Sequence, residues 1–307
     1  MTGLTSLIKR NCRLFFKDKG MFFTSLITPI ILLVLYATFL AKVYRDSFVS
    51  AMPEGFRLDE ALINGTVGAQ LISSLLAVSC VTVAFCSNML MIQDKISGAR
   101  RDLTMTPVRP AALALGYFAA STLATLIICF AALAVCLVYL AFVGWYLSVA
   151  DVLSLALDVI LLVLFGTSLS SLINYPLSTN GQGSAVGTIV SAGYGFLCGA
   201  YMPISSFSDG LQKVLSFLPG TYGTSLIRNH ALRGVYAEME SQGVPAQVLE
   251  GIRDSVDCNL YFFGEKVSIG AMYAVLVGAT VALVGVYVLI QTLAGRKRRR
   301  NGRKQTA

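Results

Sequence analysis

Long apolar stretches with almost no charge constrain this fold more than any other feature of the sequence. Six of them, at residues 21–41, 66–92, 113–142, 152–173, 184–202 and 268–293, reach or approach the roughly 20 residues that a helix needs to cross a hydrocarbon core. The chain of 307 residues is 55% hydrophobic and only 13% charged, whereas about a quarter of the residues in soluble domains are charged. We therefore predict an all-α, polytopic membrane protein with six transmembrane helices in residues 21–293.

The basic residues gather in three segments of the chain. Residues 1–20, 93–110 and 294–307 contain 16 of the 24 Lys and Arg. Six crossings place these segments on one side of the membrane, and the positive-inside rule assigns that side to the cytoplasm. Both termini are therefore expected to be cytoplasmic. The basic tail, residues 294–307, is expected to bind anionic lipid headgroups rather than nucleic acid.

The N-terminal segment, residues 1–20, is predicted to form an interfacial helix. Leu4, Leu7 and Ile8 fall near one helical face while the basic residues fall elsewhere, which is typical of a helix lying flat on a membrane surface. Two interpretations remain open: a simple anchor, or an elbow helix that also contacts a cytosolic partner. The candidate residues are Lys9, Arg10, Arg13, Phe15 and Phe16.

The cytoplasmic loop at residues 93–110 is predicted to contain a short helix at residues 99–105. The helix must stop before Pro107, because a proline disfavours the helical conformation in the residue that precedes it. A short helix between two spans can act as a lever on which a partner pushes. The alternative is a solvated loop whose arginines only set the topology.

The segment at residues 203–234 is predicted to form an external re-entrant hairpin. Two apolar helices, at residues 209–218 and 221–233, are each too short to cross the membrane and are separated by Pro219 and Gly220. A small external segment, residues 235–266, follows them. In the stretch before the hairpin, small residues recur at every fourth position and predict close helix packing, within the chain or between subunits. They are Gly183, Gly187, Ser191, Gly195 and Gly199.

Catalytic and metal-binding patterns are absent from the sequence. It has one histidine, His230, and no HExxH, GxSxG or CxxC motif, so we expect no catalytic site and no metal site in this chain. Only one cysteine, Cys258, is predicted to be external, so no internal disulfide is expected there. Asp158 is the one acidic residue inside a predicted span, and its roles as a structural hydrogen-bonding group or as a contact for a proton or substrate stay open.

ATP cannot be bound here through the usual phosphate-binding loop, because the chain has no GxxxxGK[ST] motif. A membrane protein with a lever helix and no ion pathway is expected to draw its energy from a partner chain. If ATP and magnesium are used, another polypeptide must bind them.

Three groups of residues resemble the membrane permease subunit of bacterial ATP-binding-cassette exporters of the type-2 class. The first is the basic and aromatic N-terminal segment, followed by Pro29 in the first span. The second is the cytoplasmic loop, in which Gly98 is followed by Leu103, Thr106, Pro107 and Val108 at the spacing of that class. The third is the hairpin, with Met202, Pro203, Leu218, Pro219, Gly220 and Tyr222. Ile96 and Arg101 stand where that class commonly has acids.

The resemblance implies a partner and a mechanism. Two permease subunits, identical or paralogous, would combine with two cytosolic ATPases in the bacterial plasma membrane. Residues 98–107 would be the coupling helix, with Arg100, Arg101 and Asp102 as polar contacts to the ATPase and Leu103 and Met105 as apolar anchors. The cargo expected for such a chain is a hydrophobic drug, an antimicrobial peptide or a lipid-like molecule. Two rival functions are an ion-coupled secondary transporter and a membrane assembly or scaffold protein that transports nothing.

Overall fold

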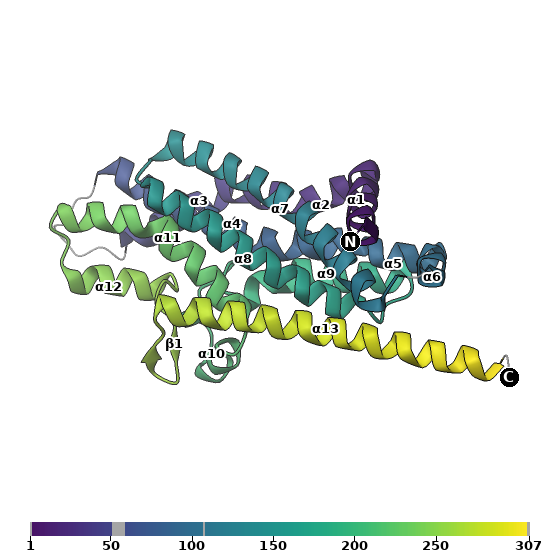
Figure 1. The fold of residues 1–307 in the computed structure, drawn as a ribbon. Helices are drawn as coiled ribbons and strands as arrows, with labels where there is room; N and C mark the ends of the chain where they lie inside the picture. The colour runs from purple at the N-terminus through teal and green to yellow at the C-terminus, as the bar shows by residue number, and fades with distance from the viewer. Residues whose placement is uncertain (1, 51–58, 107, 306–307) are drawn as a thin grey trace.

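The computed structural model describes residues 2–50, 59–106 and 108–305, which form an elongated bundle of α-helices (Figure 1). The predicted all-α fold is confirmed, with one two-stranded hairpin of β1 (Tyr261–Phe262) and β2 (Glu265–Lys266) in the described part of the chain. The helices are α1 (Thr2–Lys17), α2 (Lys19–Leu35), α3 (Ala41–Ser50), α4 (Glu60–Ser87), α5 (Met89–Ile96), α6 (Ala99–Met105), α7 (Pro110–Val143), α8 (Val149–Asn174), α9 (Asn180–Leu197), α10 (Asp209–Leu215), α11 (Pro219–Ser241), α12 (Ala246–Ser255) and α13 (Ile269–Gln305).

Four helical stretches are long and apolar enough to cross a membrane: Glu60–Ile96, Pro110–Val143, Val149–Asn174 and Ile269–Gly295. The number of candidate spans rises to five if α1 and α2, which meet at a bend of 74°, are counted together as one broken span. The protein is therefore a multi-pass membrane protein, and the predicted number of six spans is not confirmed. The glycine-rich α9 is an 18-residue helix that does not belong to the four.

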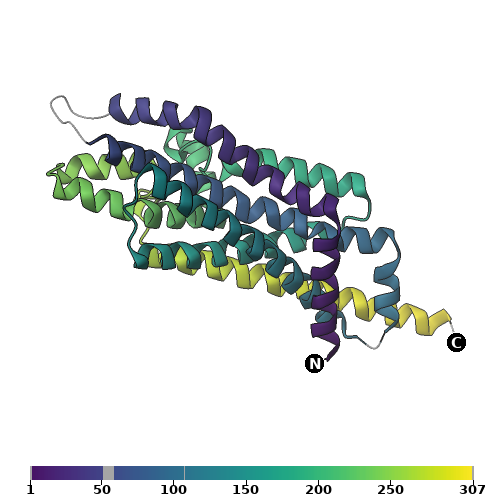
Figure 2. The same ribbon diagram turned by 90° about the horizontal axis from the view of Figure 1, so that it is seen from above.

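The bend between α1 and α2 is built by Asp18. Its side chain caps α2 by accepting a hydrogen bond from the backbone N–H of Met21, at 3.1 Å. Figure 2 shows α1 crossing one end of the bundle while α2 runs along it. A π-helical segment, Tyr36–Leu40, then joins α2 to α3. The predicted N-terminal helix is thus confirmed as a separate element.

The centre of the bundle is α4, whose side chains are buried around almost its whole circumference. It packs against α2, α7, α8, α9 and α11. An apolar helix that lacks a polar face fits such a position because it has no side to present to water. Where α4 ends, Asn88 donates hydrogen bonds to Ser170 Oγ and Ser171 Oγ of α8, at 2.9 and 2.7 Å. Interhelical hydrogen bonds of this kind stabilise contacts between membrane helices.

The α11 helix corrects the predicted boundaries of the hairpin. The second hairpin helix was expected to end before Gly234, but α11 continues to Ser241. Glycine is required there by packing rather than by helix termination: a Cβ at Gly234 would lie 1.8 Å from the carbonyl oxygen of Tyr146 in the α7–α8 loop. The first hairpin helix, expected to reach residue 218, ends at Leu215 as α10.

The last helix, α13, continues without a break into the basic tail. It begins at Ile269 and ends at Gln305, so residues 294–305 extend the helix instead of forming a separate segment. Its C-terminal end projects beyond the bundle at the end where α1 and α6 lie (Figure 1).

Candidate functional site

The predicted coupling helix is present as α6, with the expected bounds of residues 99–105. Gly98 precedes it with φ of +82°, a left-handed conformation that favours glycine and reverses the chain between α5 and α6. Arg101, Asp102, Thr106 and Met105 are exposed, and Met105 is 71% exposed. Pro107 lies outside the described residues. The helix projects from the end of the bundle, so this face is available to a partner (Figure 1).

Two of the predicted contact residues face the protein's own bundle instead. The Arg100 Nη2 donates to Gln291 Oε1 of α13 at 3.0 Å, and its guanidinium lies 5.2 Å from the centre of the Tyr175 ring. Leu103 is half-buried and packs on a cluster that includes Tyr287 of α13. Arg100 and Leu103 therefore attach α6 to the membrane helices, and Met105 is the better candidate for an apolar anchor.

Lys95 adds a second connection at this end of the bundle. Its ammonium donates to the carbonyl oxygen of Asn174 at 3.3 Å and to those of Tyr175 and Leu177. These carbonyls follow the end of α8, where backbone acceptors have no partner within the helix.

Arg10 joins α1 to the rest of the bundle. Its guanidinium donates to both carboxylate oxygens of Asp94, at 2.6 and 3.0 Å, and Tyr117 of α7 donates to the same carboxylate at 2.6 Å. Gly116 lets α1 approach α7 closely, because a Cβ there would lie 2.3 Å from a methyl carbon of Leu7. Lys9, Arg13 and Phe16 are exposed, while Phe15 is buried in the main core.

The most unexpected feature is a buried polar group around Asp158. His230 Nδ1 of α11 lies 2.6 Å from Asp158 Oδ2, and the Tyr273 hydroxyl of α13 donates to Asp158 Oδ1 at 2.6 Å. Asp158 is 1% exposed and His230 is 7% exposed. The contact with His230 was not foreseen, because this residue belongs to the segment predicted as an external hairpin. The hydrogen bonds to two other helices agree with the structural role that was kept open for this acid.

Two further pairs attach α11 to its neighbours. Arg228 is 2% exposed, lies 3.5 Å from Asp257, and donates to Gly199 O at 2.9 Å and Ser74 Oγ at 3.2 Å. Burial raises the pKa of the Asp257 carboxyl, and the Arg228 guanidinium opposes that shift. Arg233, at the outer part of α11, pairs with Asp151 at 2.5 Å.

The closeness of Arg228, His230 and Arg233 in the sequence was the available signal for these three pairs. Three basic residues within six positions require partners if their helix is buried.

The hairpin residues close the turn that leads into α11. Pro203 precedes a single 3₁₀ turn, Ile204–Ser206, and Leu218 and Pro219 begin α11. The Tyr222 hydroxyl donates to Ser216 O at 2.6 Å and holds the two helices together. Gly220 lies against the hydroxyl of Tyr194 in α9.

The five small residues at every fourth position, four of them in α9, lie in four environments. A Cβ at Gly183 would lie 2.5 Å from Met89 of α5, and one at Gly195 would lie 2.3 Å from the Tyr201 ring, so both allow close packing within the chain. The backbone oxygen of Ser191 accepts a hydrogen bond from Tyr201 at 3.4 Å. Gly199 ends the helix with φ of +74°. Gly187 has no atom within 4 Å of its Cβ position and leaves an open surface.

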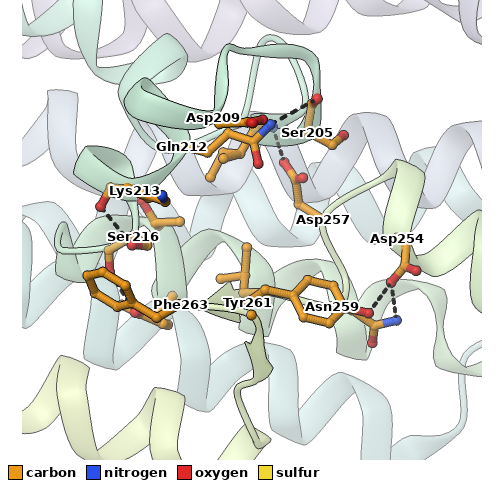
Figure 3. Close-up of a pocket in the computed structure, with 15 residues that line it drawn as sticks. Ser205, Asp209, Gln212, Lys213, Ser216, Asp254, Asp257, Asn259, Tyr261 and Phe263 are labelled. Atoms are coloured by element: carbon orange, nitrogen blue, oxygen red, sulfur yellow. Dashed lines mark hydrogen bonds between the residues drawn. The ribbon is translucent and has the colours of Figure 1, made fainter.

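A hollow of about 540 Å³ lies between α10, the turn before it and the β-hairpin (Figure 3). Asp209, Asp254 and Asp257 line it together with Lys213 and Tyr261. Asp254 accepts hydrogen bonds from Asn259 at 2.7 Å and from Tyr261 at 3.0 Å, and Asp257 accepts one from the backbone of Ile204 at 2.7 Å. These bonds hold the β-hairpin against the end of α12. They also give Asp254 and Asp257, two of the three carboxylates, a structural role.

Within the described residues, no group of three or more His, Cys, Asp or Glu could hold a metal ion. All seven cysteines, including Cys258, are free thiols.

The family model described as ABC-2 type transporter matches residues 2–231, which include α1, the α6 region, Asp158 and His230. No curated protein matches the chain.

Proposed function

The chain belongs to the ABC-2 type transporter family as a membrane permease subunit, and from this premise we propose that it exports a hydrophobic substrate with energy from ATP. A separate cassette ATPase hydrolyses the ATP, with its magnesium, and this chain supplies the path across the membrane. Two such ATPases and a second permease, identical or paralogous, complete the transporter. The complex resides in a bacterial plasma membrane with both termini in the cytoplasm.

The observation that carries the proposal is the arrangement of α6. Its outer face exposes Met105, Arg101 and Asp102, while its inner face is tied by Arg100 and Leu103 to α13 and the end of α8. A partner that binds the outer face of α6 therefore acts on α13 and α8 through the contacts of the inner face. A bound partner shifts a conformational equilibrium only if it fits the two states unequally. ATP-induced closure of the ATPases supplies that difference.

The α1 helix forms the second part of the proposed coupling surface. Arg10 and Asp94 join α1 to α5, which leads directly into α6, so a push on α6 reaches α1 over a short path. Lys9, Arg13 and Phe16 remain exposed for the ATPase or for lipid headgroups. This arrangement supports the elbow interpretation in preference to a simple anchor.

At the other end, α11 is the proposed moving element of the gate. It contacts α4, α8 and α13, and its polar side chains pair with residues on separate elements. Such paired contacts can exist in two discrete arrangements, as a gate requires. The substrate is proposed to be a hydrophobic drug, an antimicrobial peptide or a lipid-like molecule, because the chain has only a small segment between α11 and α13.

The proposal is tested with the intact complex. The permease is expressed with each cassette ATPase encoded in the same genome, and the complex is purified through a tag on the permease. We expect the ATPase to copurify and ATP hydrolysis to rise on addition of cargo. A permease that purifies alone under mild conditions, and whose cells export the cargo without any cassette ATPase, would exclude the proposal.

One observation favours a second candidate function, an ion-coupled transporter. His230 and Asp158 form a buried pair in contact with Tyr273, and proton-coupled transporters use such groups. The variant Asp158→Asn separates the two functions: loss of a pH-dependent transport component indicates ion coupling, whereas unchanged pH dependence leaves the pair a structural role.

A further inference from the structure

A second cavity, apolar and separate from the hollow in Figure 3, lies between α8, α9, the start of α11 and α13. Its volume is about 400 Å³, within the range of pockets that bind small molecules. Leu197 and Leu218 are partly exposed at its wall, so the cavity opens on the outer surface of the bundle. Its wall includes Phe165, Leu169, Leu197, Leu218, Ala279 and Leu283.

One polar group in this wall lacks a suitable partner. Tyr194 is 9% exposed, and its hydroxyl makes no hydrogen bond to oxygen or nitrogen in the described part of the chain. The neighbouring Cys198 thiol is only a weak donor and acceptor. A buried hydroxyl without a partner is unfavourable, and a water molecule needs two or more polar partners to stay in such a cavity.

Gly220 makes room for this hydroxyl. A Cβ at that position would lie 2.4 Å from the Tyr194 hydroxyl oxygen, so only glycine allows the hydroxyl to stand at the first turn of α11. The unpaired N–H groups of a first turn favour an electron-rich oxygen beside them. The hydroxyl proton then remains available to a ligand in the cavity.

We propose that the cavity binds a compact, uncharged, lipid-soluble molecule that carries one hydrogen-bond acceptor, and that the Tyr194 hydroxyl donates to this acceptor. Tyr194 lies 14 residues after the start of α9, about 21 Å along the helix at 1.5 Å per residue from its N-terminal end, which the proposed topology places at the cytoplasmic surface. That depth is within a hydrocarbon core of about 30 Å, where a phospholipid chain offers only methylene groups. A compact molecule with its own acceptor satisfies the hydroxyl, whereas a lipid tail does not. The inference goes beyond ATP-driven export and stands even if the energy source is different.

Benzophenone is a suitable probe, because it is compact and uncharged, has a single carbonyl acceptor and cross-links to nearby C–H groups on illumination. The full-length protein is reconstituted in vesicles of phosphatidylethanolamine and phosphatidylglycerol and labelled at increasing benzophenone concentrations. Mass spectrometry then locates the cross-links. We expect saturable labelling of peptides from α9 and α13, and competition by diphenyl ether but much weaker competition by diphenylmethane, which lacks the acceptor.

Three variants separate the proposed site from non-specific partitioning into lipid. Tyr194→Phe keeps the shape of the side chain and removes the hydroxyl, and should raise the half-saturating concentration about threefold to tenfold. Ala279→Phe fills the cavity and should abolish saturable labelling. Val281→Phe, on the same helix but 66% exposed, is the matched control and should behave as the unchanged protein. Thermal unfolding of each variant verifies that it is folded.

The proposal is overturned if labelling does not saturate, or if Tyr194→Phe and the Val281→Phe control bind benzophenone equally well. A parallel experiment with a phospholipid that carries a diazirine in its acyl chain tests the other occupant. Cross-linking of this lipid to the cavity, unaffected by benzophenone, would show that a lipid tail fills it and would also overturn the proposal. Transport need not be measured, so failure here is distinguishable from failure of the proposed export function.

Discussion

His230 Nδ1 lies 2.6 Å from Asp158 Oδ2 across the interface of α11 and α8, and both side chains are buried. The Tyr273 hydroxyl completes the group from α13, so three helices share one carboxylate. A hydrogen-bonded group of this kind specifies how the helices pack, because each member is costly to leave without a partner.

Asp158→Leu should therefore destabilise the protein by about 1–3 kcal/mol, since it leaves His230 and Tyr273 without their acceptor. Asp158→Asn should cost less, because the amide can still accept from Tyr273. Thermal unfolding in detergent measures both changes. The double variant Asp158→Leu with His230→Leu should be less destabilised than the sum of the single variants; strict additivity would show that the pair does not interact.

Arg228→Met should be among the most destabilising single changes in α11. It removes hydrogen bonds to Gly199 and Ser74 and leaves the Asp257 carboxylate buried without its cation, at a cost of about 3–5 kcal/mol. Arg45→Met is the control: its side chain and that of its partner Glu60 are 41% and 75% exposed, so the loss should be about 1 kcal/mol or less. Equal destabilisation of the two variants in thermal unfolding would contradict the structure. Asp257→Asn should partly restore the stability of Arg228→Met.

Met105 and Leu103 should respond differently to substitution. Met105→Glu places a charge on the exposed face of α6 and should abolish copurification of the cassette ATPase without changing the thermal stability of the permease. Leu103→Ala should lower that stability by about 1–3 kcal/mol, because the side chain packs on the permease's own core. Retention of the ATPase by Met105→Glu would refute the assigned docking face.

Arg10 should matter for coupling more than its basic neighbour does. Arg10→Met breaks the two hydrogen bonds to Asp94, whereas Lys9→Met changes only an exposed side chain. We expect Arg10→Met to reduce cargo-stimulated ATP hydrolysis several-fold and to lower stability by about 1–3 kcal/mol, with Lys9→Met near the unchanged protein. Cargo-stimulated hydrolysis by the purified complex provides the measurement. Identical activities for the two variants would exclude a role of the α1–α5 connection in coupling.

Sequence patterns predicted the local elements of this protein well. The α6 helix has the expected bounds because Gly98 and Pro107 limit it on either side, and α1 is a separate helix as its amphipathic pattern indicated. The all-α class follows from the apolar stretches alone. In these cases the cause lies within a few residues of the element.

Long-range partners were not predictable by the same means. Gly234 was interpreted as a helix end, although it lies inside α11, where the lack of a side chain makes room for the backbone of Tyr146, far away in the chain. His230 was assigned to an external hairpin, since hydropathy does not show that a short helix is buried among others. Arg100 and Leu103 lie on a helix whose two faces could be distinguished only once α13 was placed beside it.

The central claim is that this permease does work only when a separate ATPase is docked to it. A growth screen of cells with and without the gene first identifies the cargo. The permease is then reconstituted into vesicles with and without its cassette ATPase, and accumulation of this cargo in the vesicles is measured. The account predicts uphill accumulation only when both proteins and ATP are present. Uphill accumulation by the permease alone would contradict it.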